Sequence, residues 1–371
     1  MATRQIISKH INVASGDYIG RDGELWIDTE TNTMRVSDGA TPGGVTLTTD
    51  GDITSTWANI TDINNGSGPS KIAVGFTAGY TTQGTSGIAI GNSAGSNTQG
   101  NFAVAIGATA GQTTQGALAV AVGSSAGETN QGDYGVAVGY RAGYTGQSSK
   151  AVAVGFNAGN ATQGERAVAI GDGAGEATQG NNAVAVGNDA GKTNQGTDSI
   201  AIGSDAGNAD QGAGSIAIGD YAGTTTQGGA AIAIGNSAGS LRQSYNGTAV
   251  GWFAGYSDQG NQSVAIGAQA GLTTQGTKAI AIGYQAGKTN QAANSIVLNA
   301  TGLALNNTTA SSLRIKPIRN ATMTTILGYD AGTGEVTHNA AIPGYISLAD
   351  LKAEVAASAD FAAFKIRIAA L

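Results

Sequence analysis

A strict sixteen-residue period limits the possible folds of this chain more than any other feature. The tetrapeptide at Ile72–Gly75 recurs every 16 residues, with Val and Ile exchanged, and its closing glycine is present in fourteen consecutive copies, the last at Gly283. No insertion interrupts the spacing, and a fifteenth copy, Ile296–Asn299, lacks the glycine and marks the end of the array. A short, unbroken period is typical of a repeat protein whose units pack mainly on their neighbours.

The repeat has the consensus φ-A-φ-G-x-x-A-G-x-x-x-Q-G-x-x-x, where φ is Val or Ile, and we number its positions 1 to 16. An Ala-Gly pair fills positions 7 and 8, and a glutamine fills position 12 in all fourteen copies. We expect these glutamines to form an amide ladder, in which each carboxamide donates to one neighbour and accepts from the other. They are Gln83, Gln99, Gln115, Gln131, Gln147, Gln163, Gln179, Gln195, Gln211, Gln227, Gln243, Gln259, Gln275 and Gln291.

The consensus indicates β-structure. Alternation in φ-A-φ places the two branched residues on one face of a strand and the alanine on the other. Sixteen residues cannot hold two helices, and glycines at positions 4 and 8 suit tight turns. We therefore predict an all-β fold, a β-solenoid in which each repeat is one coil. At about 4.8 Å per coil, fourteen coils would stack to roughly 65–70 Å.

Such a coil is thin, and one chain would bury only a modest core. We interpret the alanine at position 2 as a place where the backbone of a further chain packs closely, which makes oligomerisation an expectation. The pattern leaves open which face of the strand would lie on the oligomer axis.

The φ-A-φ-G-x-x-A-G core resembles the head repeat of YadA-like trimeric adhesins over residues 71–298, and this resemblance implies a homotrimer of left-handed β-rolls. The flanks are similar to other proteins. The stretch Gly23–Gly39 resembles a small module near the N-termini of bacteriophage tail-fibre and appendage proteins, and Leu313–His338 resembles a β segment found late in phage fibres. The tail, Ser347–Leu371, is similar to the C-termini of virion proteins from marine cyanophages.

These patterns divide the chain into five parts. The expected division is a β-rich attachment module at 1–50, a linker at 51–70, the β-roll shaft at 71–299, a small β segment at 300–345 and a C-terminal helix at 346–371 that would form a bundle in the trimer.

Together the resemblances imply a structural phage fibre, a rigid trimeric shaft for host attachment, carried on the virion and made in the host cytoplasm. Its partners would be its own copies, another virion protein at the N-terminal module, and a host surface glycan or protein. Two alternatives remain open: the head of a YadA-like bacterial surface adhesin, or a head or neck decoration fibre without a receptor. Residues 1–18 lack the continuous apolar core of a secretory signal, which favours the phage interpretation.

An aromatic repeat near residues 245–256 offers the candidate ligand-binding residues Tyr245, Trp252, Phe253 and Tyr256, since aromatic faces serve as binding anchors. Outward turn positions also vary freely, so the same rings could be chance surface residues, and a receptor site at the C-terminal tip is an equal alternative.

Composition argues against other functions. The chain has no Cys and only two His, so we expect no metal site and no cofactor. A formal net charge of −7 without a basic stripe argues against nucleic-acid binding, and no apolar run is long enough to insert in a membrane. Asp189 and Asp205 share one repeat position and could imitate a glycosidase pair, but we predict that the protein is not an enzyme.

Overall fold

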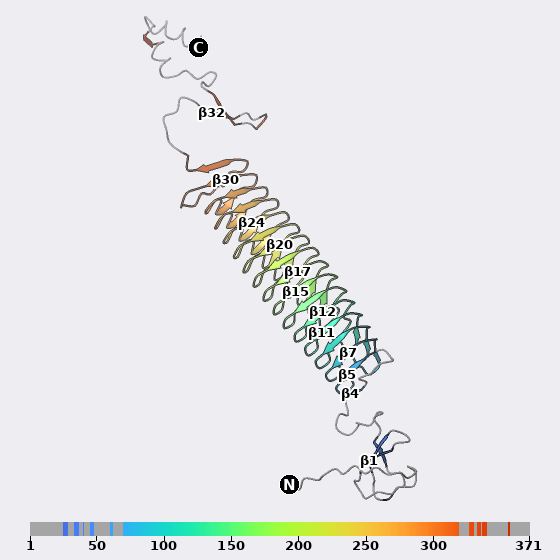
Figure 1. The fold of residues 1–371 in the computed structure, drawn as a ribbon. Helices are drawn as coiled ribbons and strands as arrows, with labels where there is room; N and C mark the ends of the chain where they lie inside the picture. Colours follow the sequence, from blue (N-terminus) through green and yellow to red (C-terminus); the bar gives the residue numbers. More distant parts are fainter. Residues whose placement is uncertain are drawn as a thin grey trace, which may run out of the picture. The chain divides into compact units, whose positions relative to one another are not determined.

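The computed structural model describes residues 70–318 without a gap and, outside them, residues 25–28, 33–36, 40, 45–47, 60–61, 326–329, 332–334, 336–339 and 355–356. Residues 72–316 form a parallel β-solenoid (Figure 1), which confirms the predicted class of fold. Each 16-residue repeat is one coil, and we number the coils 1 to 15 from Ile72.

Positions 1 to 3 of the coils build the main sheet, in which every strand pairs in register with its equivalent 16 residues away. Its regular strands are β5 (Ile72–Val74), β7 (Ile88–Ile90), β9 (Val104–Ile106), β11 (Val120–Val122), β12 (Val136–Val138), β13 (Val152–Val154), β15 (Val168–Ile170), β17 (Val184–Val186), β18 (Ile200–Ile202), β20 (Ile216–Ile218), β22 (Ile232–Ile234), β24 (Thr248–Val250), β26 (Val264–Ile266), β28 (Ile280–Ile282) and β30 (Ile296–Asn299).

A second series of strands, each two or three residues long, ends at the glutamine of position 12 and also pairs in parallel. Its members are β6 (Thr82–Gln83), β8 (Thr98–Gln99), β10 (Thr114–Gln115), β14 (Thr162–Gln163), β16 (Thr178–Gln179), β19 (Asp210–Gln211), β21 (Thr226–Gln227), β23 (Leu241–Gln243), β25 (Ser257–Gln259), β27 (Thr273–Gln275) and β29 (Thr289–Gln291).

Both ends of the main sheet carry an additional strand. At the N-terminal end β4 (Ile60–Thr61), which lies in the stretch expected to be a linker, pairs antiparallel with β5. At the C-terminal end β31 (Leu313–Lys316) pairs in parallel with β30, so the ladder continues past the expected boundary at 299.

The flanking segments contribute two small antiparallel sheets. One holds β1 (Leu25–Asp28), β2 (Thr33–Val36) and β3 (Val45–Leu47), and the other is the hairpin of β32 (Ile326–Tyr329) and β33 (Val336–Asn339). Within the expected C-terminal helix, Val355 and Ala356 are helical, and the rest of that prediction lies outside the described residues.

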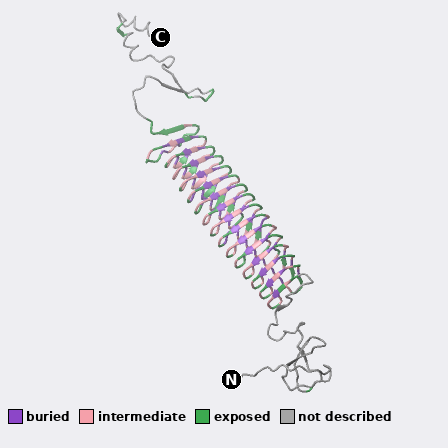
Figure 2. Ribbon diagram, viewed as in Figure 1, coloured by how far each residue is buried: buried purple, intermediate pink, exposed green. Residues whose placement is uncertain are grey.

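The interior of the solenoid is made of small residues, and here our interpretation of the alanine column is wrong. Ala at position 2 points into the coil and is fully buried in every coil from 2 to 14 (Figure 2), packed with Ala at position 7, while the branched residues at positions 1 and 3 face outward. The physical reason is the narrowness of the coil. In coil 11 the Cβ atom of Ala233 would lie only 3.2 Å from a methyl group built on Gly239 across the interior, so a branched side chain would not fit there.

The glutamines supply the polar half of this interior. Gln179, only 2% exposed, donates from Nε2 to the Val168 carbonyl at 2.8 Å and to Gln195 Oε1 at 3.0 Å, and accepts at Oε1 from Gln163 at 3.1 Å. The same bond joins most neighbouring coils. It is missing between Gln195 and Gln211 and before Gln99, where the amide oxygens of Gln99 and Gln211 are buried without a hydrogen-bond partner. Each carboxamide thus ties its own coil to the main sheet, and most of them also tie it to the next coil.

Candidate binding surfaces on the solenoid

The outward face of the main sheet is a continuous apolar surface, which we call the φ stripe. It consists of positions 1 and 3 of coils 1 to 15, thirty side chains of which all but Thr248 are Val, Ile or Leu. The residues at position 3 are substantially exposed, for example Ile170 at 41% and Ile202 at 39%. Fourteen steps of about 4.8 Å make the stripe roughly 67 Å long. Soluble monomers rarely leave a contiguous apolar surface of such extent uncovered.

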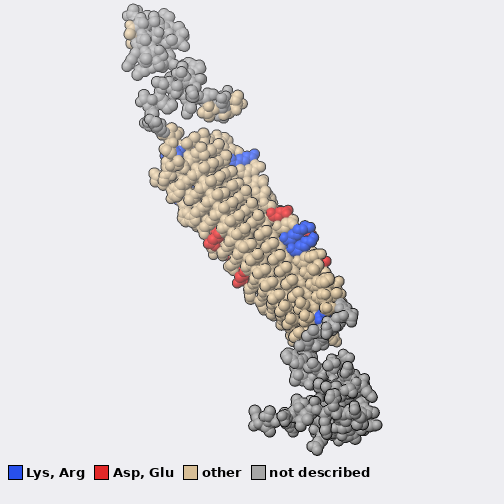
Figure 3. All heavy atoms as spheres, in the orientation of Figure 1, with Lys and Arg blue, Asp and Glu red and all other residues tan. Residues whose placement is uncertain are grey.

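The opposite sheet has a polar outward face. Position 11 is exposed in most coils and carries Thr, Asn, Asp or Arg everywhere except Gly146. Charged side chains are sparse on the face seen in Figure 3. The solenoid is therefore amphipathic, with a polar face on one sheet and the φ stripe on the other.

The four predicted aromatic binding residues do not form one group. Trp252, Phe253 and Tyr256 come from positions 5, 6 and 9 of coil 12, with ring centres 4.9 Å apart for Trp252–Phe253 and 5.0 Å for Phe253–Tyr256. Tyr245 comes from position 14 of coil 11, on the other turn, and no ring contact among the described residues joins it to the three. The Trp252 side chain is 51% exposed, so this cluster is open to solvent.

A second aromatic group on the same turn was not among the predicted binding residues. Tyr140 and Phe156 fill position 5 of coils 5 and 6, and their rings stack with centres 5.2 Å apart. Arg141 lies over the Tyr140 ring. The signal was in the sequence, because Tyr140 stands seven whole repeats before Trp252 and so occupies the same position in its coil.

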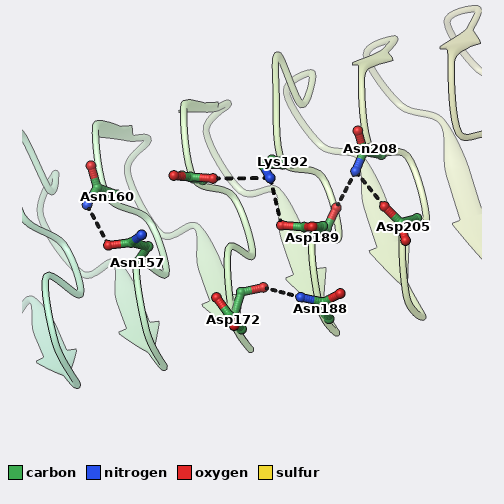
Figure 4. Close-up of polar contacts among 9 residues, drawn as sticks. Asn157, Asn160, Asp172, Asn188, Asp189, Lys192, Asp205 and Asn208 are labelled. Atoms are coloured by element: carbon green, nitrogen blue, oxygen red, sulfur yellow. Dashed lines mark hydrogen bonds and ion pairs between the residues drawn. The ribbon is translucent and has the colours of Figure 1, made fainter.

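Asp189 and Asp205, which share one repeat position, have different polar partners. The Asp189 carboxylate lies 3.0 Å from the ammonium of Lys192, whereas Asp205 accepts a hydrogen bond from Asn208 at 2.8 Å (Figure 4). The hydrogen bond that Lys192 donates to Asp189, aided by the negative charges of Asp189 and Glu176, raises the pKa of Lys192 and keeps its ammonium charged. Each carboxylate therefore has its own partner on an exposed turn, which is the arrangement of a structural polar ladder.

The opposite turn bears a shallow polar depression of about 560 Å³ over coils 4 to 7, lined by Asp133, Tyr134, Lys150, Glu165 and others. Ser148, which also lines the depression, is one of three residues that replace the glycine at position 13. No group of three or more metal-ligating side chains occurs in the described part of the chain.

Comparison of the chain with models of protein families, with curated protein sequences and with solved structures returned no match. Among the described residues, no helix is long and apolar enough to cross a membrane.

Proposed function

We propose that this chain is the shaft of a bacteriophage virion fibre, in which three copies pack through their φ stripes and hold a stiff rod between the virion and the host surface. The alternatives are the head of a bacterial surface adhesin and a decoration fibre without a receptor. The observation that carries the proposal is the φ stripe, a continuous apolar surface along the whole length of the solenoid.

A second copy of the chain is the occupant that best fits the stripe. A partner must match both its length of roughly 67 Å and its repeat of about 4.8 Å, and another copy does so automatically. Symmetric homo-oligomers are built in this way, since a closed ring buries the same surface patch on every subunit. Three copies would also present three sets of any weak binding site, which raises the avidity of host attachment.

The regular solenoid supports a mechanical role. Its coils are joined throughout by in-register parallel strands and at most junctions by the glutamine ladder, so most coils are braced in the same way as their neighbours. In this proposal the N-terminal module attaches the fibre to another virion protein, and the protein carries out no catalytic step.

The first test is the mass of the purified protein in solution. We expect light scattering to give about three times the chain mass of 36.4 kDa. The triple variant Ile170→Asp, Ile202→Asp, Ile234→Asp should be monomeric, because these side chains are already about 40% exposed in the single chain but would be buried in the trimer.

The matched control places the same charges on the polar sheet as Thr162→Asp, Thr178→Asp and Thr226→Asp, where other coils already carry aspartate. It should remain trimeric. Circular dichroism checks that both variants keep their β-structure. A monomeric parent protein, or equal dissociation of both variants, would rule out the φ stripe as the trimer interface.

The virion assignment needs a separate test, in which gold-labelled antibodies against the solenoid are applied to phage particles and to producing cells. Labelling of thin fibres on the particles supports the phage proposal, and label at the tail separates an attachment fibre from a head decoration. Labelling of the cell envelope alone would instead favour the adhesin.

A further inference from the structure

Coils 5 and 6 carry an aromatic platform with an arginine held on it, which we call the Arg141 patch (Tyr140, Arg141, Tyr144 and Phe156). The Tyr140 and Phe156 rings stack at 5.2 Å with an interplanar angle of 18°. The guanidinium carbon of Arg141 lies 5.4 Å from the centre of the Tyr140 ring and 5.2 Å from that of Tyr144. Cation–π contact with two rings holds the guanidinium at a defined place on the surface.

The charge of Arg141 has no partner within the described chain. No carboxylate among the described residues lies within ion-pair distance of it, whereas Arg166 pairs with Glu165 at 3.0 Å and Arg242 pairs with Asp258. Arg141 is exposed, and its guanidinium donates no hydrogen bond to another described residue. The patch therefore presents unpaired, charged hydrogen-bond donors to an external anion.

Neutral hydrogen-bonding groups lie directly beside the rings. Asn157 and Asn160 follow Phe156 on coil 6, and Asn160 donates to Asn157 Oδ1 at 3.2 Å (Figure 4) and to the Arg141 carbonyl at 3.4 Å. The side-chain nitrogen Nδ2 of Asn157 donates no hydrogen bond to the described residues, whereas its backbone N–H donates to the Tyr140 carbonyl at 3.0 Å. Amides next to exposed aromatic faces are suited to hydroxyl groups.

We propose that the Arg141 patch binds an acidic saccharide, a sugar bearing a carboxylate. The apolar C–H face of the sugar would lie against the Tyr140 and Phe156 rings, its carboxylate would pair with the Arg141 guanidinium, and its hydroxyls would bond the asparagines. The patch spans two coils, about 10 Å, which matches one or two sugar rings and is far smaller than the roughly 800 Å² per partner of a stable protein interface.

The sequence offers an internal comparison. The Trp252 cluster has rings on the same turn but no unpaired cation among them, so it lacks the group that would select an acid. The inference rests on coils 5 and 6 alone and goes beyond the proposed fibre role, since the patch could bind its sugar in an adhesin as well.

The test measures binding of the purified full-length protein by titration calorimetry to short oligogalacturonates, oligomannuronates and sialyllactose. The neutral probes are the methyl ester of the oligogalacturonate and lactose, which keep the sugar rings without the charge. We expect at least one acidic probe to bind, its neutral counterpart to bind at least about tenfold more weakly, and the affinity to fall with added salt.

Arg141→Gln should lower that affinity about tenfold or more, and Phe156→Ala should lower it several-fold. The control is Arg166→Gln, which removes an exposed arginine from the neighbouring coil that also has a left-handed backbone, φ 59° against 51° for Arg141. Its affinity should be unchanged.

Three results would each overturn the proposal: no acidic probe binds, the neutral probes bind equally well, or Arg166→Gln weakens binding as much as Arg141→Gln does. None of them bears on the mass or virion tests, so failure of this site and failure of the fibre proposal are distinguishable.

Discussion

Replacing Gln179 with Leu is expected to destabilise the solenoid locally by about 3–5 kcal/mol, since each buried polar group left unmatched costs roughly 1–3 kcal/mol. The variant would remove the donor to the Val168 carbonyl, the acceptor of Gln163 and the donor to Gln195. Leucine has a similar size, so the loss would report hydrogen bonding more than packing volume.

The measurement is amide hydrogen exchange, because long repeat arrays do not unfold in one cooperative step. Coils 6 to 8 should exchange faster in Gln179→Leu, while coils at the far ends keep the protection of the parent protein. The control is Gln269→Leu. Gln269 also belongs to a glutamine pair, accepting from Gln285 at 2.7 Å, but at a half-exposed turn position, and its effect should stay below about 1 kcal/mol. Equal effects of the two variants would mean that the ladder adds nothing beyond an ordinary surface contact.

Gly187→Ala is expected to separate coil 8 from coil 9, with a local loss above about 3 kcal/mol. Gly187 has φ 132°, a backbone conformation that residues other than glycine rarely adopt. A Cβ atom added there would lie 2.6 Å from the carbonyl oxygen of Gly203 in the next coil. The clash is with backbone, so no rotamer change can relieve it. Hydrogen exchange should show faster opening on both sides of this coil junction.

Gly214→Asn is the matched control. Gly214 also has a positive φ, 66°, but nothing lies within 4 Å of the Cβ position, and Asn182 and Asn246 already adopt the same conformation at this position of their coils. The substitution should be neutral, or stabilising by up to about 1 kcal/mol, because it restricts the unfolded chain. If Gly187→Ala left the local stability of the coil junction unchanged, the idea that the glycine at position 4 permits the close stacking of the coils would be contradicted.

The proposed binding surfaces depend on this stacking. Tyr140 and Phe156 meet only because position 5 repeats in register from coil to coil, and the φ stripe is continuous for the same reason. A coil junction that opens would therefore interrupt both the proposed trimer interface and any binding site that spans it.

A large part of this architecture follows from the sequence. The period predicts one coil per 16 residues, the glycines at position 4 predict the tight turns, and the glutamines at position 12 predict the ladder whose bonds include Gln179 to Gln195. These features are local, or repeat at one fixed separation, so a column of identical residues must lie stacked in any fold with that period.

What only the tertiary structure decided is which side of the strand faces inward and which rings meet. Alternation in φ-A-φ separates two faces but does not say which is buried. The usual preference for burying Val and Ile would predict that the branched residues face inward, which is the opposite of what the structure shows. The coil is so narrow that alanine and the glutamine carboxamide fill it, which forces the branched side chains outward. Likewise Tyr245 and Trp252 are seven residues apart but lie on different turns, while Tyr140 and Phe156 are sixteen apart and stack. Proximity in a solenoid follows position within the coil, and the dimensions of the folded coil determine which positions are covered.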